Sequence, residues 1–148
     1  MGLAEKINDD MKASMKARDE LRLSTIRMLK AAMKNREIEK GAALSDDDVV
    51  AVASSLIKQR RDSVEQYRKG GRADLADREE AEIKVLEGYL PAQLSAEEIA
   101  SIIKEAVAQA GASSPADMGK VMKLVMPRVK GKADGKLVNE KVKELLGG

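Results

Sequence analysis

Seven residues near the C-terminal end have the types and spacing of a phosphate-binding surface. They are five lysines and two glycines: Gly119, Lys120, Lys123, Lys130, Gly131, Lys132 and Lys136. From residue 111 to 148 eight Lys or Arg face four Asp or Glu, whereas residues 1–110 hold 19 against 21. Lysines neutralise phosphates, and a glycine-lined loop lets backbone amides approach a phosphate or sugar closely. This local positive charge favours an anionic partner, of which nucleic acid is the commonest large one, although a solvated surface would carry similar charges.

Two predicted helices and the connection between them must position these residues. Ser114, Pro115 and Asp117 have the pattern of an N-cap, a first-turn proline and an acidic third position. Asp134 is placed to cap the last helix. The apolar positions expected to pack between the two helices are Met118, Val121, Met122, Val125, Leu137, Val138, Val142, Leu145 and Leu146.

The remaining segments also have a helical period, which predicts an all-α fold. The first segment has an apolar stripe at Leu3, Ile7, Met11 and Met15. A second segment ends at Gly41, and its pattern is compatible with either a separate helix or a continuation of the first. Ser45 with Asp48, and Ser95 with Glu98, have the spacing of capping boxes. We expect an N-terminal antiparallel helical bundle followed by a small three-helix C-terminal domain, with domains 1–93 and 94–148.

Charged residues of the first domain have mainly structural explanations. Arg22, Lys30, Lys34 and Arg36 alternate with apolar positions, which is typical of a solvated helix face. Arg60 and Arg61 lie in the middle of a helix, and we expect one of them to bridge to Glu65 or to an acid of a neighbouring helix. The acidic run 46–48 is better explained by the helix dipole than by a metal.

Composition restricts the chemistry open to the chain. It contains no Cys and no His, which removes thiolate ligands, the usual neutral-pH base and the commonest metal ligand. No Ser has the Gly-rich surround that would expose a nucleophile, and no phosphate-binding GxxxxGK[ST] motif is found, so no catalytic residue, metal site or cofactor is predicted. The N-terminus lacks the apolar run of a secretion signal and no stretch is long and apolar enough to cross a bilayer, from which we expect a cytoplasmic location and no membrane partner.

Several separate motifs resemble one protein family. DMGKVM at 117–122 and KGKADGK at 130–136 resemble the tail domain of the GatB subunit of the glutamine-dependent tRNA amidotransferase. RLSTIRMLKAAMKNREIEKG at 22–41, KQRRDSVEQYRKGG at 58–71 and LEGYLPAQLS at 86–95 resemble the YqeY family, the stand-alone relatives of that tail. The resemblance runs essentially from end to end. It implies contact with tRNA and an association with carbon–nitrogen ligase chemistry that uses glutamine as amide donor, whose catalytic sites lie in other subunits.

The leading hypothesis is therefore a non-catalytic module that binds tRNA or another structured RNA through the seven C-terminal residues. With two Tyr and no Phe or Trp, the chain lacks the aromatic platforms on which single-stranded bases stack. The alternative is a protein-interaction adaptor that uses the N-terminal helices, with an amidotransferase or translation-related protein as its partner. Met11, Met15, Met28 and Met33 would then line an adaptable groove, although such residues are more often core.

Overall fold

The chain is helical, and residues 2–147, which the computed structural model describes, contain no β-strand. The all-α fold predicted from the sequence is confirmed. The helices of the described chain are α1 Leu3–Ala17, α2 Glu20–Lys40, α3 Asp46–Lys69, α4 Ala73–Glu87, α5 Ala96–Ala110, the short 3₁₀ helix η1 Pro115–Asp117, α6 Met118–Val129 and α7 Gly135–Leu145.

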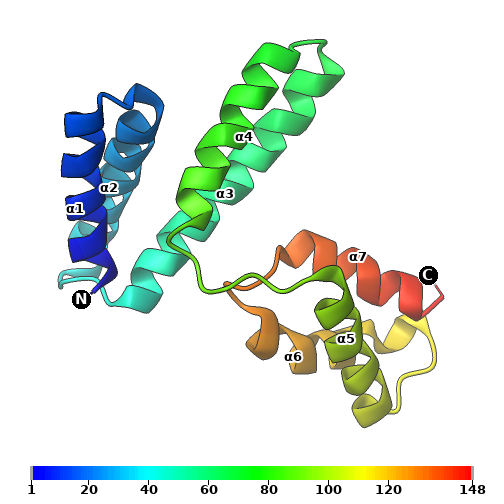
Figure 1. Ribbon diagram of the computed structural model, residues 1–148. Helices are drawn as coiled ribbons and strands as arrows, with labels where there is room; N and C mark the ends of the chain where they lie inside the picture. The colour runs from blue at the N-terminus through cyan, green and yellow to red at the C-terminus, as the bar shows by residue number, and fades with distance from the viewer. Residues whose placement is uncertain (1, 148) are drawn as a thin grey trace. The chain divides into compact units, whose positions relative to one another are not determined.

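The helices form two compact units, Met1–Leu90 and Pro91–Gly148. The first contains α1 to α4, arranged as two helical hairpins, and the second contains α5 to α7 (Figure 1). Each unit has its own cluster of buried apolar side chains. The predicted domain bounds, 1–93 and 94–148, stay a prediction.

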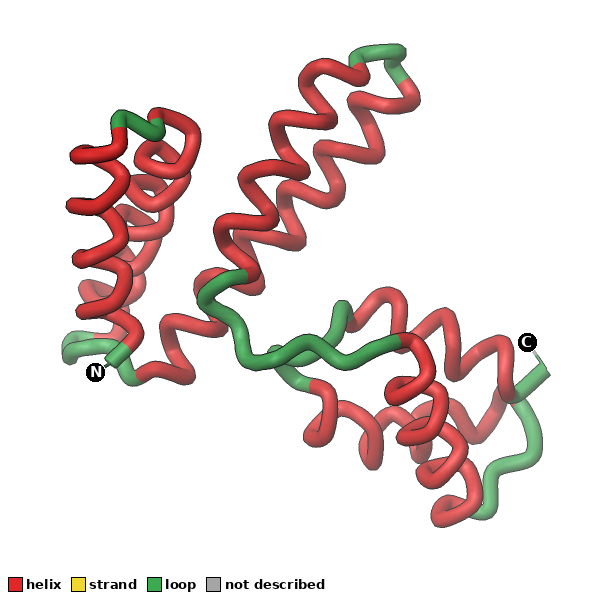
Figure 2. The backbone as a smooth tube through the Cα atoms, in the orientation of Figure 1, coloured by secondary structure: helices red, strands yellow, loops and turns green. Residues whose placement is uncertain are grey.

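The helices α1 and α2 are separate and are joined by a short turn (Figure 2). Arg18 adopts a left-handed conformation with φ 56°, and its amide donates to the carbonyl of Met15. The side chain of Asp19 then accepts a hydrogen bond from the Arg22 amide at 3.1 Å and caps α2. The apolar stripe is thus interrupted by a C-cap and an N-cap in adjacent positions.

The helix α3 begins with the predicted capping box. The Ser45 amide donates to Asp48 Oδ2 at 2.9 Å, and the Asp48 amide donates to Ser45 Oγ at 3.1 Å. The Lys40 ammonium also donates to the Asp48 carboxylate. This bond, together with those to Ser45, lowers the pKa of Asp48 to about 2. Part of the acidic run therefore serves the helix terminus, as the sequence predicted.

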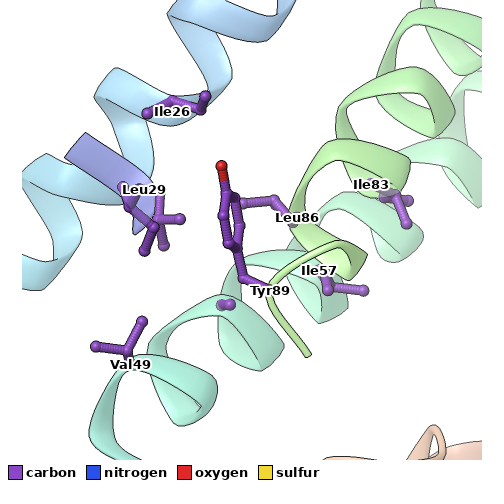
Figure 3. Close-up of a cluster of buried hydrophobic side chains, with 9 residues drawn as sticks. Ile26, Leu29, Val49, Ile57, Ile83, Leu86 and Tyr89 are labelled. Carbon is purple, nitrogen blue, oxygen red and sulfur yellow. The ribbon is translucent and has the colours of Figure 1, made fainter. Parts of the chain in front are cut away.

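The core of the first unit lies where the two hairpins meet. Leu29 of α2, Ile57 of α3 and Leu86 of α4 are buried, and the ring of Tyr89 stands among them (Figure 3). The Tyr89 hydroxyl donates to Asp10 Oδ2 of α1 at 2.7 Å. This one side chain thus connects the end of the second hairpin to the first.

The core of the second unit is aliphatic and small. Its buried residues come from all three helices, and they are Ile99, Ile103, Ala106, Val121, Val125, Val129, Val138, Val142 and Leu146. The predicted packing of Leu137 and Leu145 is wrong, because these side chains are 42% and 47% exposed. Each precedes a buried residue, and the 100° turn between neighbours moves it off the buried face.

Candidate nucleic-acid interface

The outward side of α6 carries the first group of predicted site residues. Gly119, Lys120 and Lys123 are exposed, whereas Val121 and Val125 of the same helix are fully buried. At 100° per residue, Lys120 and Lys123 lie on the side of α6 away from the buried valines, and Lys130 follows directly after the helix. The valine face therefore fixes the direction in which these ammonium groups point.

The connection between α6 and α7 is a hydrogen-bonded turn. The Val129 carbonyl accepts from the amides of Lys132 at 2.8 Å and Ala133 at 3.1 Å. Gly131 has φ 76°, a conformation that favours glycine. The turn is thereby held by its own backbone, with Lys130 and Lys132 exposed on either side of Gly131.

A preceding segment of the same unit also holds this turn. Gln93 Nε2 donates to the Gly131 carbonyl at 3.0 Å and to the Pro91 carbonyl at 2.9 Å. The Leu94 amide donates to the Lys132 carbonyl at 2.8 Å. Sequence reasoning missed Gln93 and Leu94, because no local pattern indicates a bond to residues almost 40 positions later.

Lys136 lies at the beginning of α7. Its amide donates to Asp134 Oδ1 at 3.3 Å, which confirms the predicted N-cap, and its side chain is exposed. The corresponding prediction for Ser114 is wrong, since its side chain makes no capping bond. The carboxylate of Asp117 instead accepts from the Ser113 amide at 3.1 Å, and α6 begins through the 3₁₀ turn.

The lysines of this surface differ in their ion pairs. Lys120 lies 4.0 Å from Asp117, a long pair with an exposed ammonium. Among the residues that the structure describes, Lys123, Lys130 and Lys132 have no carboxylate within 4.0 Å. Arg128, in contrast, pairs with Glu105 of α5 at 2.6 Å. Three uncompensated charges thus lie along α6 and its following turn.

The exposed lysines of this site can attract anions, but several backbone amides of the turn already have hydrogen-bond partners. The amides of Lys130, Lys132 and Ala133 already donate to helix carbonyls. These three amides are therefore occupied within the turn, and the role predicted for backbone amides near Gly119 and Gly131 stays a prediction. Residues 2–147 also contain no group of three or more Asp or Glu that could hold a metal.

The sequence motifs and the helical architecture agree with a match to a known family. Residues 4–146 match the family described as Yqey-like protein. The chain belongs to the YqeY-like family. The resemblance read from the sequence is confirmed in that respect.

Three curated relatives of this YqeY-like chain come from fungi. The protein of Lachancea thermotolerans named "Altered inheritance of mitochondria protein 41, mitochondrial" is 42% identical over 85 residues, which cover 57% of this chain and 46% of that protein. Proteins with the same name are 29% identical in Pyrenophora tritici-repentis, over 96% of this chain and 80% of the relative, and in Saccharomyces cerevisiae, over 95% and 66%. The chain thus spans about half the length of the first curated relatives it matches.

The names of these relatives overturn the expected cytoplasmic location, because all three proteins are described as mitochondrial. That expectation rested on the absence of a secretion signal, which does not distinguish the cytoplasm from the interior of an organelle. The structural finding is narrower: none of the described helices is long and apolar enough to span a bilayer.

Proposed function

We propose that this YqeY-like protein is a non-catalytic accessory module whose C-terminal unit binds the phosphate backbone of a structured RNA, with tRNA as the leading candidate. The observation that carries the proposal is the set of exposed lysines without carboxylate partners on α6 and its turn, at Lys123, Lys130 and Lys132. Lysine ammonium groups recognise phosphates as point charges, without reading bases.

The type of RNA follows from the chemistry of the surface. The second unit contains no aromatic residue, so it has no platform on which an unpaired base could stack. Recognition of shape and backbone, as in folded or double-stranded RNA, remains open to it. The resemblance to the GatB tail points to tRNA and to a complex that amidates aminoacyl-tRNA, in which this protein has a supporting role.

The proposal is tested by binding purified protein to total tRNA at about 50 and 200 mM salt. We expect affinity to fall steeply with salt, and we expect the variant Lys123→Glu/Lys130→Glu/Lys132→Glu to lose most binding, because each phosphate contact contributes a slope of roughly 0.7–0.9. The matched control is Lys58→Glu/Lys69→Glu/Lys84→Glu in α3 and α4, which changes the net charge equally. Equal losses in both variants, or no binding at low salt, would contradict the proposal.

A second candidate is favoured by a groove between α2 and α3. It has a volume of about 410 Å³ and includes Ala32, Ala51, Val52, Ser55 and Leu56 in its lining. Grooves of this kind accept amphipathic helices, which supports the adaptor hypothesis. The variant Ser55→Arg would place a large side chain in this groove. If the RNA proposal is correct, we expect this variant to bind tRNA with the affinity of the wild-type protein.

A further inference from the structure

The two helical hairpins of the first unit carry opposite charge. Residues 3–40, which form α1 and α2, contain ten Lys or Arg and seven Asp or Glu. Residues 46–87, which form α3 and α4, contain eight Lys or Arg and eleven Asp or Glu. The unit is neutral as a whole, so its net charge conceals a cationic hairpin and an anionic one.

The charges of the second hairpin are largely paired within it. Arg60 lies 3.1 Å from Glu82, and Arg61 lies 3.2 Å from Glu87. Arg68 lies 3.2 Å from Asp77 and also contacts Glu80. These carboxylates therefore have cationic partners in the same hairpin.

Three cations of α2 differ from this pattern. Arg27, Lys30 and Lys34 recur at intervals of three and four residues, and none has a carboxylate within 4.0 Å in the described part of the chain. The Lys30 ammonium donates to the Met11 sulfur, a weak acceptor, at 3.9 Å. We call these three residues the α2 cationic row.

The row borders a groove between α1 and α2. The groove has a volume of about 440 Å³, and its lining includes Lys30 and Lys34 on one side and Asn8 on the other. Lys12 lies one helical turn beyond Asn8 on the same face of α1 and is exposed. Glu37 is the one acidic residue in the lining. An extended anion could therefore follow the groove past several ammonium groups.

We propose that the α2 cationic row is a second phosphate-binding surface, which contacts the backbone of the same RNA that the C-terminal unit binds. The inference rests on the proposed function for the identity of the polyanion. Three cations on consecutive turns, with no described carboxylate within 4.0 Å, match the charge of a phosphate chain. Their spacing from Arg27 to Lys34 covers about 10 Å of helix.

An anionic membrane fits the same charge less well. Membrane-surface helices combine a cationic face with a broad apolar face that enters the lipid, commonly with Trp, Phe or Leu. The chain has no Trp or Phe, and α2 buries Ile26 and Leu29 in the protein core. The exposed large apolar residues of α2 are Met28 and Ile38, which are ten residues apart.

The test uses the full chain with Arg27→Glu/Lys30→Glu/Lys34→Glu and measures tRNA affinity at several salt concentrations. If all three residues contact phosphates, the salt slope should fall by about 2 to 3, equivalent to roughly 20- to 40-fold in affinity between 50 and 200 mM salt. The glutamine variant of the same three positions should show the reduced slope without added repulsion. Circular dichroism melts show whether either variant has lost its fold.

The matched control is again Lys58→Glu/Lys69→Glu/Lys84→Glu, which places the same charge change on the other hairpin of this unit. Wild-type slope in both row variants, with binding lost in the C-terminal lysine variant, would overturn this inference and leave the proposed function intact. Absence of tRNA binding by the wild-type protein would overturn both. If the row variants kept wild-type tRNA binding but no longer sedimented with phosphatidylserine vesicles as the wild-type protein does, the row would be assigned to a membrane. That result would also overturn the inference.

Discussion

The second hairpin and the C-terminal unit use positive charge in opposite ways. In α3 and α4, Arg60 is 6% exposed and contacts Glu82, which is 8% exposed, so that the pair is part of the packed structure. On α6 and its turn, Lys123, Lys130 and Lys132 are exposed and lie more than 4.0 Å from any described carboxylate. One region uses cations to hold helices together, and the other leaves them exposed without a described carboxylate partner.

The choice of residue agrees with this division. Arginine offers five donors in a planar fork and suits partly buried pairs, whereas lysine is a mobile, strongly hydrated point charge. Arg60 shows the consequence: its Nε donates to Glu82, one Nη donates to the Leu56 carbonyl, and the other contacts the Met28 sulfur. The comparison predicts that changes in the hairpin affect stability and changes on α6 affect binding.

The largest expected effect is that of Arg60→Ala. It leaves the buried Glu82 carboxylate without its closest partner, and breaking a buried pair in this way costs about 3–5 kcal/mol. We expect a matching decrease in the free energy of unfolding, measured by urea denaturation with α-helical circular dichroism. The binding of tRNA by folded protein should keep its salt slope.

A second variant distinguishes the charge from the packing. Arg60→Met/Glu82→Leu removes both partners and keeps apolar volume, so it should recover much of the lost stability. If the double variant were as unstable as Arg60→Ala, the contacts to Leu56 and Met28 would matter more than the ion pair.

The next effect concerns the bond between Tyr89 and Asp10. Tyr89→Phe retains the buried ring but removes a hydrogen bond to a carboxylate, which contributes about 1.5–3 kcal/mol. Burial of the hydroxyl, and then its bond to Asp10, raises the pKa of Tyr89. The stabilisation is therefore present in full below the unfolded pKa of about 10 and is lost as pH rises through the folded pKa.

The measurement is urea denaturation of wild type and Tyr89→Phe at pH 7, 9 and 10.5. The difference in unfolding free energy should be constant at the two lower values and decrease at the highest one. A difference that did not change with pH would show that the hydroxyl stabilises the protein only by packing.

Local patterns predicted the helical fold and several of its boundaries. Ser45 with Asp48, and Ser95 with Glu98, form the expected capping boxes, because both partners of each bond lie within one turn. The expected bridge from Arg60 or Arg61 is also confirmed, and both residues pair with acids of α4. The capping boxes depend on spacing along one helix, which the sequence displays directly, and the bridge is expected because an arginine in the middle of a packed helix needs an acidic partner.

Contacts between distant segments could not be predicted in this way. Tyr89 and Asp10 are 79 residues apart, and Gln93 reaches Gly131 across 38 residues, so no periodicity connects them. For the seven predicted interface residues, the structure gives the positions of the side chains but does not test what they bind. The structure places Lys120 and Lys123 on the exposed side of α6 and Lys130 in the turn that follows it, and their binding to RNA stays a prediction.

The smallest expected effect is that of a substitution at Gly119, an exposed glycine within α6. A Cβ added there meets no atom within 4 Å, so the fold does not require glycine at this position. Gly119→Ala should therefore stabilise the unit slightly, by about 0.5–1 kcal/mol, because alanine favours the helix. If RNA approaches the backbone closely between Lys120 and Lys123, the same methyl group should weaken tRNA binding.

The informative outcome is a change of opposite sign in the two measurements, a higher melting temperature with lower tRNA affinity. Gly131→Ala is the matched control, since its φ of 76° makes a side chain strained and should lower stability. Improved stability with unchanged affinity for Gly119→Ala would remove Gly119 from the interface while leaving the lysines in place. Glycine at 119 would then be a tolerated cost to the helix rather than a requirement of the ligand.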